Sequence, residues 1–582
     1  MAEELWPGGM EYTFGNDADE EKAKLYRSLG VTSIESYVTW QTVEDKGKDQ
    51  WDWSVWDKQV DILKRNNLKW VPFLIVGPAY SIPNWFRQTP DHFGCICLEH
   101  GTQSKVESLW NPNLPKWIER FIAEFAKKYR GENVIESVLL GIQGDYGEAI
   151  YSVTGGGWTF KGPGEYHNHQ GFWCNDDYAL ADFRKYFSGK YRRISSLNKA
   201  WGAAFKAFDE IDFPARGEAF IEYRKKTASL GPEGRRRWLD FVEWYRGSMT
   251  RWSDWWIGLT WKYFPDTEIY LCTGGDAIPE HGSDFAQQCR VAAKHGAGVR
   301  ITNEGSNYAA NFVITRWVGS AGKFYNAYYG FEPAGAEDEK GIAVRIYNAT
   351  ASGARQLHDY NPNVIKSEQT ISAQKANFKY IFAAKPTVDA ALWYPNVSLT
   401  LDWQGFFEKA SALRDVLDYD YVDETMLRDG ALKKYSILIM LHGAVLEDAD
   451  IRTIREWVKD GGALAALDFG QLETVGGDKK YHKRTFKISG GTKSIGEGKT
   501  LYVPVKWENR QEFFDKLSRL IEKEGLINPD GEADGVYATV LDKNRVLYLN
   551  TTNDPVKKKI MLPDGRKVKA KVPPNAITEI VF

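Results

Sequence analysis

The sequence is poor in cysteine and contains no long apolar run. Its 582 residues include five cysteines, and this odd, scattered number is not a disulfide framework. No apolar stretch approaches the 18 or so residues that a membrane-spanning helix needs. Acidic and basic residues nearly balance, at 78 and 75, so the chain lacks the basic face of a nucleic-acid-binding protein. We therefore expect neither a membrane span nor a nucleic-acid partner.

The amino terminus also lacks a recognisable targeting signal. The opening residues MAEELWPGG contain no apolar segment of the kind that signal peptides carry. The first expected strand follows almost at once, as it would if a leader had been removed. Localisation is therefore left open between the cytoplasm and the periplasm or exterior.

The cysteine spacing does not favour a metal site. Cys95 and Cys97 are separated by one residue, and Cys174 lies far along the chain. The paired C-x-x-C spacing that is common in structural zinc sites is missing. The sequence therefore favours buried or free thiols over zinc ligands, and it predicts no metal and no cofactor.

Aromatic residues, in contrast, are abundant. They make up 14% of the chain, with 23 tryptophans and 30 tyrosines. Such rings can stack on the apolar faces of sugars, but most aromatic side chains in any protein fill cores and interfaces. The composition is therefore compatible with a carbohydrate site without requiring one.

Residues 1–385 alternate apolar runs with amphipathic helical patterns. Residues 71–76, VPFLIV, read as a buried strand of a parallel sheet. Val55, Val60, Ile62 and Leu63 recur at helical spacing in the segment before it. Further helices are expected at 20–29, 117–129 and 238–264, and further strands at 31–40, 268–272, 299–302 and 324–329. This alternation predicts a (β/α)8 barrel with long loops, the longest at 151–177.

The pattern changes after residue 385. Residues 386–528 predict a small doubly wound, flavodoxin-like α/β domain, with strands at 435–441 and 463–467 and a helix at 448–459. Residues 529–582 consist of short β-rich runs separated by glycine and proline turns, which predict a small antiparallel β domain.

One stretch of the barrel carries the features of an active site. Residues 139–151, LLGIQGDYGEAIY, form an apolar strand that leads into a glycine-rich turn containing Asp145 and Glu148. The carboxyl ends of barrel strands are where catalytic loops converge. A carboxylic acid kept neutral there can act as a general acid. The alternative is a turn with ordinary surface acids.

The order of the predicted domains resembles the β-galactosidases of glycoside hydrolase family 42. Residues 197–214, LNKAWGAAFKAFDEIDFP, resemble that family's "LN.AWG..FW....DEI..P" segment, and IPNWFRQTPD at 82–91 resembles "P.WL....P". Residues 341–361 are similar to the helix and last strand of its barrel, and 435–467 to its second domain. The resemblance implies a glycosidase barrel and, through the second domain, a homotrimer.

The acidic turn departs from that family. Family 42 places an asparagine before its acid/base glutamate, whereas this chain has GDYGE. The turn and the residues after it look more like the β-amylases of glycoside hydrolase family 14, whose "G..GELRYPS" turn supplies the general acid. Glu148 matches the acid in both comparisons, and Asp145 is the alternative.

The resemblance also implies a second carboxylate. Glu332 ends a strand that is similar to "PF..MEQ", in which the glutamate is the nucleophile, and Glu304 is the alternative one strand earlier. Glu148 would protonate the glycosidic oxygen while Glu332 attacks the anomeric carbon, with retention of configuration. An inverting, β-amylase-like reaction with the same pair is the alternative.

These considerations give a set of expected sugar contacts and three candidate functions. The leading function is an exo-acting β-galactosidase-like hydrolase. The alternatives are a hydrolase of a modified, for example sulfated, galactan or other β-linked oligosaccharide, and a barrel that binds carbohydrate without catalysis. Basic residues for an anionic group would be Lys161, His167, His169 and Arg300. The expected sugar contacts are Trp40, Asn111, Tyr146, Trp158, Tyr329 and His358.

Overall fold

The computed structural model describes most of the chain. The described residues are 7–15, 18–144, 146–151, 167, 169–303, 307–333, 338–360, 364–467, 472–480, 485–486, 490–526, 535–542, 544–561 and 567–581. They form two compact units, one of residues 11–302 and one of residues 303–582 with residues 7–10. No helix in these ranges is both long and apolar enough to cross a membrane.

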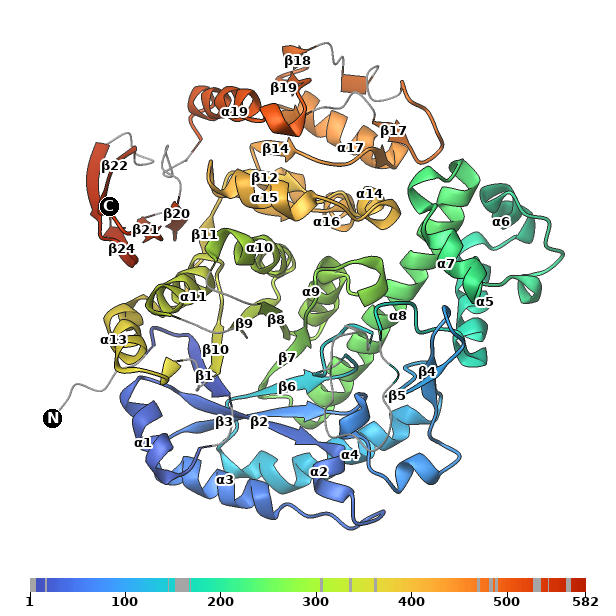
Figure 1. The fold of residues 1–582 in the computed structure, drawn as a ribbon, viewed down its shortest axis with the longest axis vertical. Coiled ribbons are helices and arrows are strands. Elements are labelled where there is room, and N and C mark those ends of the chain that lie inside the picture. Colours follow the sequence, from blue (N-terminus) through green and yellow to red (C-terminus); the bar gives the residue numbers. More distant parts are fainter. Residues whose placement is uncertain are drawn as a thin grey trace. The chain divides into compact units, whose positions relative to one another are not determined.

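Eight parallel strands form a closed barrel, as predicted (Figure 1). Their order around the barrel is β1-β10-β9-β8-β7-β6-β3-β2. Leu140 of the β6 strand, for example, pairs with Leu74 on one side and with Leu271 on the other. The strands are β1 (Glu11–Gly15), β2 (Ser33–Thr39), β3 (Lys69–Ile75), β6 (Ser137–Gly141), β7 (Glu268–Thr273), β8 (Gly298–Asn303), β9 (Tyr328–Pro333) and β10 (Gln356–Tyr360).

Helices separate most of these strands, and several follow the predicted bounds closely. Val55 was expected among the apolar residues that share one face of the helix Ser54–Arg65. Its side chain is 55% exposed, so it does not belong to the buried face of that helix. The longest, α8, begins before its predicted start because Pro232 stands at its first turn, where a missing N–H costs nothing. These helices are α1 (Glu20–Ser28), α3 (Ser54–Arg65), α4 (Leu114–Tyr129), α8 (Pro232–Tyr263), α9 (Phe285–Lys294), α10 (Tyr308–Tyr325) and α11 (Glu339–Ala351).

The predicted strand at 324–329 was placed too early. Helix α10 continues to Tyr325, and Asn326 ends it with a left-handed backbone at φ 66°. Strand β9 then starts at Tyr328. Aromatic residues suit both helix and strand, so the residue types could not reveal that Phe324 and Tyr325 complete the helix.

The long connections of the barrel carry extra elements. After β3, the chain forms an antiparallel pair of short strands, β4 (Gly94–Ile96) and β5 (Gln103–Glu107). Between β6 and α8 it adds the helices α5 (Asp177–Tyr191), α6 (Ile194–Trp201) and α7 (Glu218–Arg224). The Trp201 indole N–H in the AWG motif donates to the buried Asp240 carboxylate of α8 at 2.7 Å. This motif therefore anchors α6 to α8.

The second unit contains the predicted flavodoxin-like sheet. Its strand order is β13-β12-β14-β16-β19-β18, which is 2-1-3-4-5 in chain order for the five parallel strands. The strand β18 (Gly491–Ile495) adds an antiparallel edge. The parallel strands are β12 (Ala390–Trp393), β13 (Asp420–Val422), β14 (Ile437–Met440), β16 (Ala463–Leu467) and β19 (Gly498–Val503). The main helices are α15 (Phe406–Arg414), α17 (Asp448–Lys459) and α19 (Gln511–Lys523).

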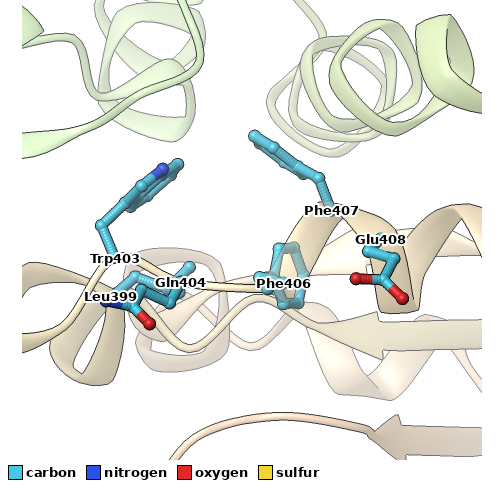
Figure 2. Close-up of a pocket in the computed structure, with 7 residues that line it drawn as sticks. Leu399, Trp403, Gln404, Phe406, Phe407 and Glu408 are labelled. Atoms are coloured by element: carbon cyan, nitrogen blue, oxygen red, sulfur yellow. The ribbon is translucent and has the colours of Figure 1, made fainter.

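A pocket of about 250 Å³ opens on this α/β sheet unit, between α14 (Asn396–Leu401) and α15. The Trp403 and Phe407 rings point to the same side of it (Figure 2), with their centroids 5.7 Å apart. None of the predicted site residues lines it.

The carboxyl-terminal residues form an antiparallel sheet, as predicted. The order is β11-β20-β21-β24, so the short β11 (Pro386–Thr387) joins this last sheet. The boundaries predicted at residues 385 and 528 remain predictions. The other strands are β20 (Val536–Leu541), β21 (Arg545–Asn550) and β24 (Ala576–Val581), with a separate hairpin of β22 (Val556–Met561) and β23 (Lys567–Val572).

Candidate active site

The chain turns sharply where β6 ends, and glycines make this turn possible. The Ile142 N–H donates to the Gly147 carbonyl at 2.8 Å, which closes the turn on itself. Gly147 has φ 98°, and a Cβ there would lie 2.7 Å from the Cα of Gly141. A side chain at Gly147 would be strained in its backbone and would also collide with the strand.

Glu148 lies at the end of this turn with its side chain largely buried. It is 9% exposed, and its Oε2 accepts the backbone N–H of Tyr146 at 2.8 Å. A Cβ on Gly144 would lie 2.8 Å from that same oxygen, and one on Gly274 would lie 3.0 Å from the Glu148 Cγ. Close backbone on these sides therefore confines the carboxyl group.

The turn is also tied to the neighbouring strand β7. The Ala149 N–H donates to the Cys272 carbonyl at 2.8 Å. The Gln288 side chain on α9 donates to the Ala149 carbonyl at 2.9 Å and accepts the Thr273 hydroxyl at 2.8 Å. Because Gln288 and Thr273 are fully buried, these bonds form in a low-dielectric setting and hold Glu148 in one position.

A further acid lies on the loop after β7, and the sequence reasoning missed it. Asp276 comes three residues after the strand and faces Nδ1 of His281 at 3.1 Å. Burial would raise the pKa of Asp276, but the hydrogen bond and charge of His281 outweigh burial and hold this pKa below its usual value. An acid just past a barrel strand was the signal that could have found it.

In the second unit, Glu332 is the penultimate residue of strand β9. It is 3% exposed, and its Oε1 accepts the hydroxyl of Tyr360 on β10 at 2.8 Å. His358, two residues earlier on β10, packs edge-on against the Tyr360 ring with centroids 5.1 Å apart. Between them in sequence, the Asp359 carboxylate lies 3.9 Å from the Arg345 guanidinium of α11. Glu332 is thus held by a side chain of the next strand.

Tyr360 was also missed from the sequence. It follows His358 at a spacing of two, which places both side chains on the same side of a strand. The alternation of side-chain directions along QLHDY could therefore have identified Tyr360 as a neighbour of His358. That inference requires the bounds of this last strand to be known.

Arg300 lies in a different setting from the one expected. It pairs with Glu35 of β2, and both side chains are fully buried. Its charge is already compensated by a carboxylate in a buried setting. This pairing argues against the expected contact of Arg300 with an anionic substrate group, which stays a prediction.

The expected sugar contacts fall into different environments. Trp40 is fully buried, and its indole N–H donates to Glu44 at 2.6 Å, so it offers no ring face to a sugar. The Asn111 amide donates to the Asp91 carbonyl and accepts the Asn113 N–H, which makes it a loop-forming residue. Tyr146 is 40% exposed, whereas Tyr329 and His358 are buried. Asp145, Trp158, Lys161 and Glu304 lie outside the described residues.

Comparison with known proteins links one segment to amylases. Residues 102–268, which include the Glu148 turn, match the model of glycosyl hydrolase family 14. The thermophilic β-amylase of Thermoanaerobacterium thermosulfurigenes is 25% identical over 256 residues, which cover 42% of this chain and 44% of that protein. The chain thus matches less than half the length of this relative.

Solved structures resemble the chain over a wider range. A β-galactosidase from Bacillus circulans sp. alkalophilus superposes with a TM-score of 0.71 at 13% identity, covering 99% of both chains. The catalytic domain of the β-amylase from Paenibacillus polymyxa superposes with a TM-score of 0.53 at 18% identity, covering 64% of this chain and 98% of that one. Both resemblances expected from the sequence are thereby confirmed, the first for the fold as a whole and the second for the barrel.

Proposed function

We propose that the protein is a glycoside hydrolase, with Glu148 as the acid/base and Glu332 as the nucleophile. The observation that carries the proposal is that Glu148 lies in the turn after strand β6 and Glu332 lies at the carboxyl end of strand β9, and that both strands belong to one closed parallel barrel. Loops at that end of such barrels carry the catalytic groups. The match of residues 102–268 to a glycosidase family includes Glu148 and adds support.

The proposed reaction removes a terminal β-galactose or a related β-linked sugar with retention. Glu148 donates its proton to the glycosidic oxygen while Glu332 attacks the anomeric carbon, which gives a glycosyl-enzyme and a free leaving group. Glu148, now a base, takes a proton from water, and the water displaces Glu332. Burial of both side chains supports this assignment, because it keeps water from competing for their hydrogen bonds.

An inverting reaction is the second candidate, and the amylase-like segment favours it. The turn that carries Glu148 lies within the family 14 match, which supports this candidate. The relationship to amylases covers only part of the chain, however, so inversion is placed second. In an inverting reaction Glu332 would act as a base on water instead of forming a covalent bond.

The test is turnover of aryl glycosides followed by NMR of the first-formed sugar. The panel is nitrophenyl β-galactoside, β-glucoside, β-mannoside, β-fucoside and α-arabinoside. We expect β-galactoside turnover with the β-anomer formed first, and loss of turnover in Glu148→Gln. The α-anomer formed first would establish inversion. If the protein bound galactan oligosaccharides but hydrolysed neither them nor any other glycoside, the result would instead support a barrel that binds carbohydrate without catalysis.

A homotrimer formed through the flavodoxin-like domain is a separate proposal. It is supported by the resemblance of residues 435–467 to the second domain of family 42. Light scattering coupled to gel filtration should give a mass near three times 66.3 kDa. A mass of one chain across the micromolar range would refute it.

A further inference from the structure

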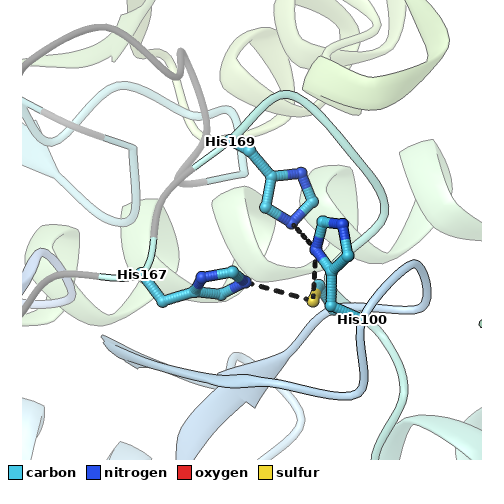
Figure 3. A group of neighbouring side chains, drawn as sticks. His100, His167 and His169 are labelled. Atoms are coloured by element: carbon cyan, nitrogen blue, oxygen red, sulfur yellow. Dashed lines mark hydrogen bonds between the residues drawn. The ribbon is translucent and has the colours of Figure 1, made fainter.

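Four potential metal ligands converge in the first unit, outside the turn of Glu148. Cys97, His100, His167 and His169 each present one ligand atom, and these atoms all lie within 4.8 Å of one another. Figure 3 shows the three imidazole rings directed toward one centre. Cys97 and His100 lie between β4 and β5, whereas the other two lie before Phe172. The cluster therefore joins two segments far apart in sequence.

Three of the six separations between these atoms are close to those of a tetrahedral zinc site, and none of the six exceeds 4.8 Å. With Zn–S bonds of about 2.3 Å and Zn–N bonds of about 2.05 Å, tetrahedral angles separate sulfur from nitrogen by about 3.6 Å and two nitrogens by about 3.3 Å. The Cys97 Sγ lies 3.4 Å from His167 Nε2 and 3.7 Å from His100 Nδ1. The His100 Nδ1 lies 3.2 Å from His169 Nε2.

The surroundings orient one of the rings as a metal ligand would be oriented. The Nδ1 of His169 lies 3.1 Å from the Gln170 carbonyl, and since a carbonyl can only accept, Nδ1 carries the proton. The lone pair of this ring is then on Nε2, which faces the cluster. Metal-binding histidines are commonly fixed in this way by a hydrogen bond from the other nitrogen.

The backbone around the cluster is tightly held. The Leu98 N–H donates to the Phe172 carbonyl at 2.7 Å, and the Glu99 carboxylate accepts the Phe172 N–H at 3.0 Å. A Cβ on Gly171 would lie 2.6 Å from His169 Cε1 and 2.8 Å from Glu99 Oε1. These contacts place the two segments side by side without the metal, so the site is preorganised for an ion.

We propose that Cys97, His100, His167 and His169 bind one Zn²⁺ ion as a structural site. One thiolate and three imidazoles suit zinc, and four protein ligands leave no open position for a catalytic water. The ion would fasten the β4–β5 connection to the chain that follows the Glu148 turn. Cysteine spacing could not predict this site, because the ligand set contains one cysteine and three histidines from two distant segments. This proposal does not depend on the hydrolase proposal.

Metal analysis of the full chain tests the site. After exposure to Zn²⁺ and gel filtration, we expect about one zinc per chain in the unaltered protein and almost none in Cys97→Ser or His167→Gln. The matched controls are Cys289→Ser and His295→Gln, which change a cysteine and a histidine on or next to α9 and should retain the ion. Equal zinc content in all five proteins would overturn the proposal.

A measurement on the unaltered protein covers the case in which a variant fails to fold. Co²⁺ should give the intense visible bands of tetrahedral coordination together with a thiolate charge-transfer band, and Zn²⁺ should abolish both. Chelation should lower the thermal midpoint, and added Zn²⁺ should restore it. Absence of the charge-transfer band, or no retained metal at micromolar Zn²⁺, would show instead a hydrogen-bonded cluster of thiol and imidazoles.

Discussion

The two buried glutamates at barrel strand ends are held by different means. Glu148 is confined by main chain, since its carboxylate accepts a backbone N–H and glycines approach it closely. Glu332 is held by a side chain, the hydroxyl of Tyr360. The position of the Glu148 carboxyl group depends on whether the residues of the turn can adopt its backbone conformation. The position of the Glu332 carboxyl group depends on one neighbouring side chain. The first arrangement should therefore be sensitive to glycine substitution and the second to loss of a hydroxyl group.

The largest expected effect separates the chemical roles of the two acids. Glu148→Gln and Glu332→Gln should each lower kcat/KM on a nitrophenyl glycoside by about 10²- to 10⁴-fold, because each removes a group that acts in the transition state. On a dinitrophenyl glycoside, whose leaving group needs no proton, Glu148→Gln should recover most of this loss and Glu332→Gln none. Steady-state kinetics on both substrates provides the measurement. Equal losses on both substrates would contradict the assignment.

The next effect tests the backbone-held turn. Gly147→Ala places a Cβ in a left-handed conformation and against the Gly141 Cα, which should destabilise the protein by about 1–3 kcal/mol. The kcat/KM should fall with it as Glu148 shifts. The control is Gly189→Ala within α5, where a Cβ meets nothing within 4 Å and alanine should be neutral or stabilising. Denaturant unfolding and kinetics check both variants, and similar behaviour of the two would argue against a strained turn.

Tyr360→Phe tests the side-chain-held acid. Loss of the hydrogen bond to Glu332 should lower kcat/KM by about 10-fold, because bonds to a charged group contribute about 1.5–3 kcal/mol and water replaces part of that. The matched control is Tyr263→Phe, which removes a 3.0 Å bond to Glu119 at the end of α8 and should leave kcat/KM unchanged. If both variants kept full activity, Tyr360 would have no positioning role.

The smallest expected effect concerns the link between the Glu148 turn and β7. Thr273→Val removes the hydroxyl donor to Gln288 at nearly constant volume, which should cost about 0.5–1.5 kcal/mol of stability. Because Gln288 still donates to the Ala149 carbonyl, kcat/KM should change by less than about 5-fold. Unfolding in urea and kinetics provide the readouts. A loss of activity as large as that of Gly147→Ala would mean that the β7 link, and not the glycines, positions the acid.

Much of the fold could be read from local patterns. Helix α17 and strand β16 occur at the predicted bounds, because amphipathic spacing and an unbroken apolar run are local properties of the chain. The strand predicted at 324–329 was misplaced because aromatic residues fit a helix end equally well. Periodicity therefore located elements better than it located their boundaries.

The candidate site was predictable only in part. Glu148 and Glu332 stand next to recognisable strand ends, and both are buried in the structure. Trp40 was expected to contact a sugar, and Arg300 was a candidate for an anionic group in the alternative of a modified substrate. In the structure, Trp40 packs in a core and Arg300 pairs with Glu35. Residue type alone does not show whether an aromatic ring stacks on a sugar or packs in the core, or whether an arginine binds a ligand or a buried carboxylate. The residues that these side chains contact are distant in sequence.

By itself, the sequence determined the order of strands and helices, the barrel and the acids near the carboxyl ends of its strands. Those features depend on periodicity and on residues a few positions apart, and such local patterns are visible in the sequence itself. Only the tertiary structure decided that Tyr360 contacts Glu332, that Gln288 holds the Glu148 turn and that Cys97 meets three histidines. These contacts join residues that the chain separates by as many as 139 positions, and their formation depends on how the strands close and how the long connections pack.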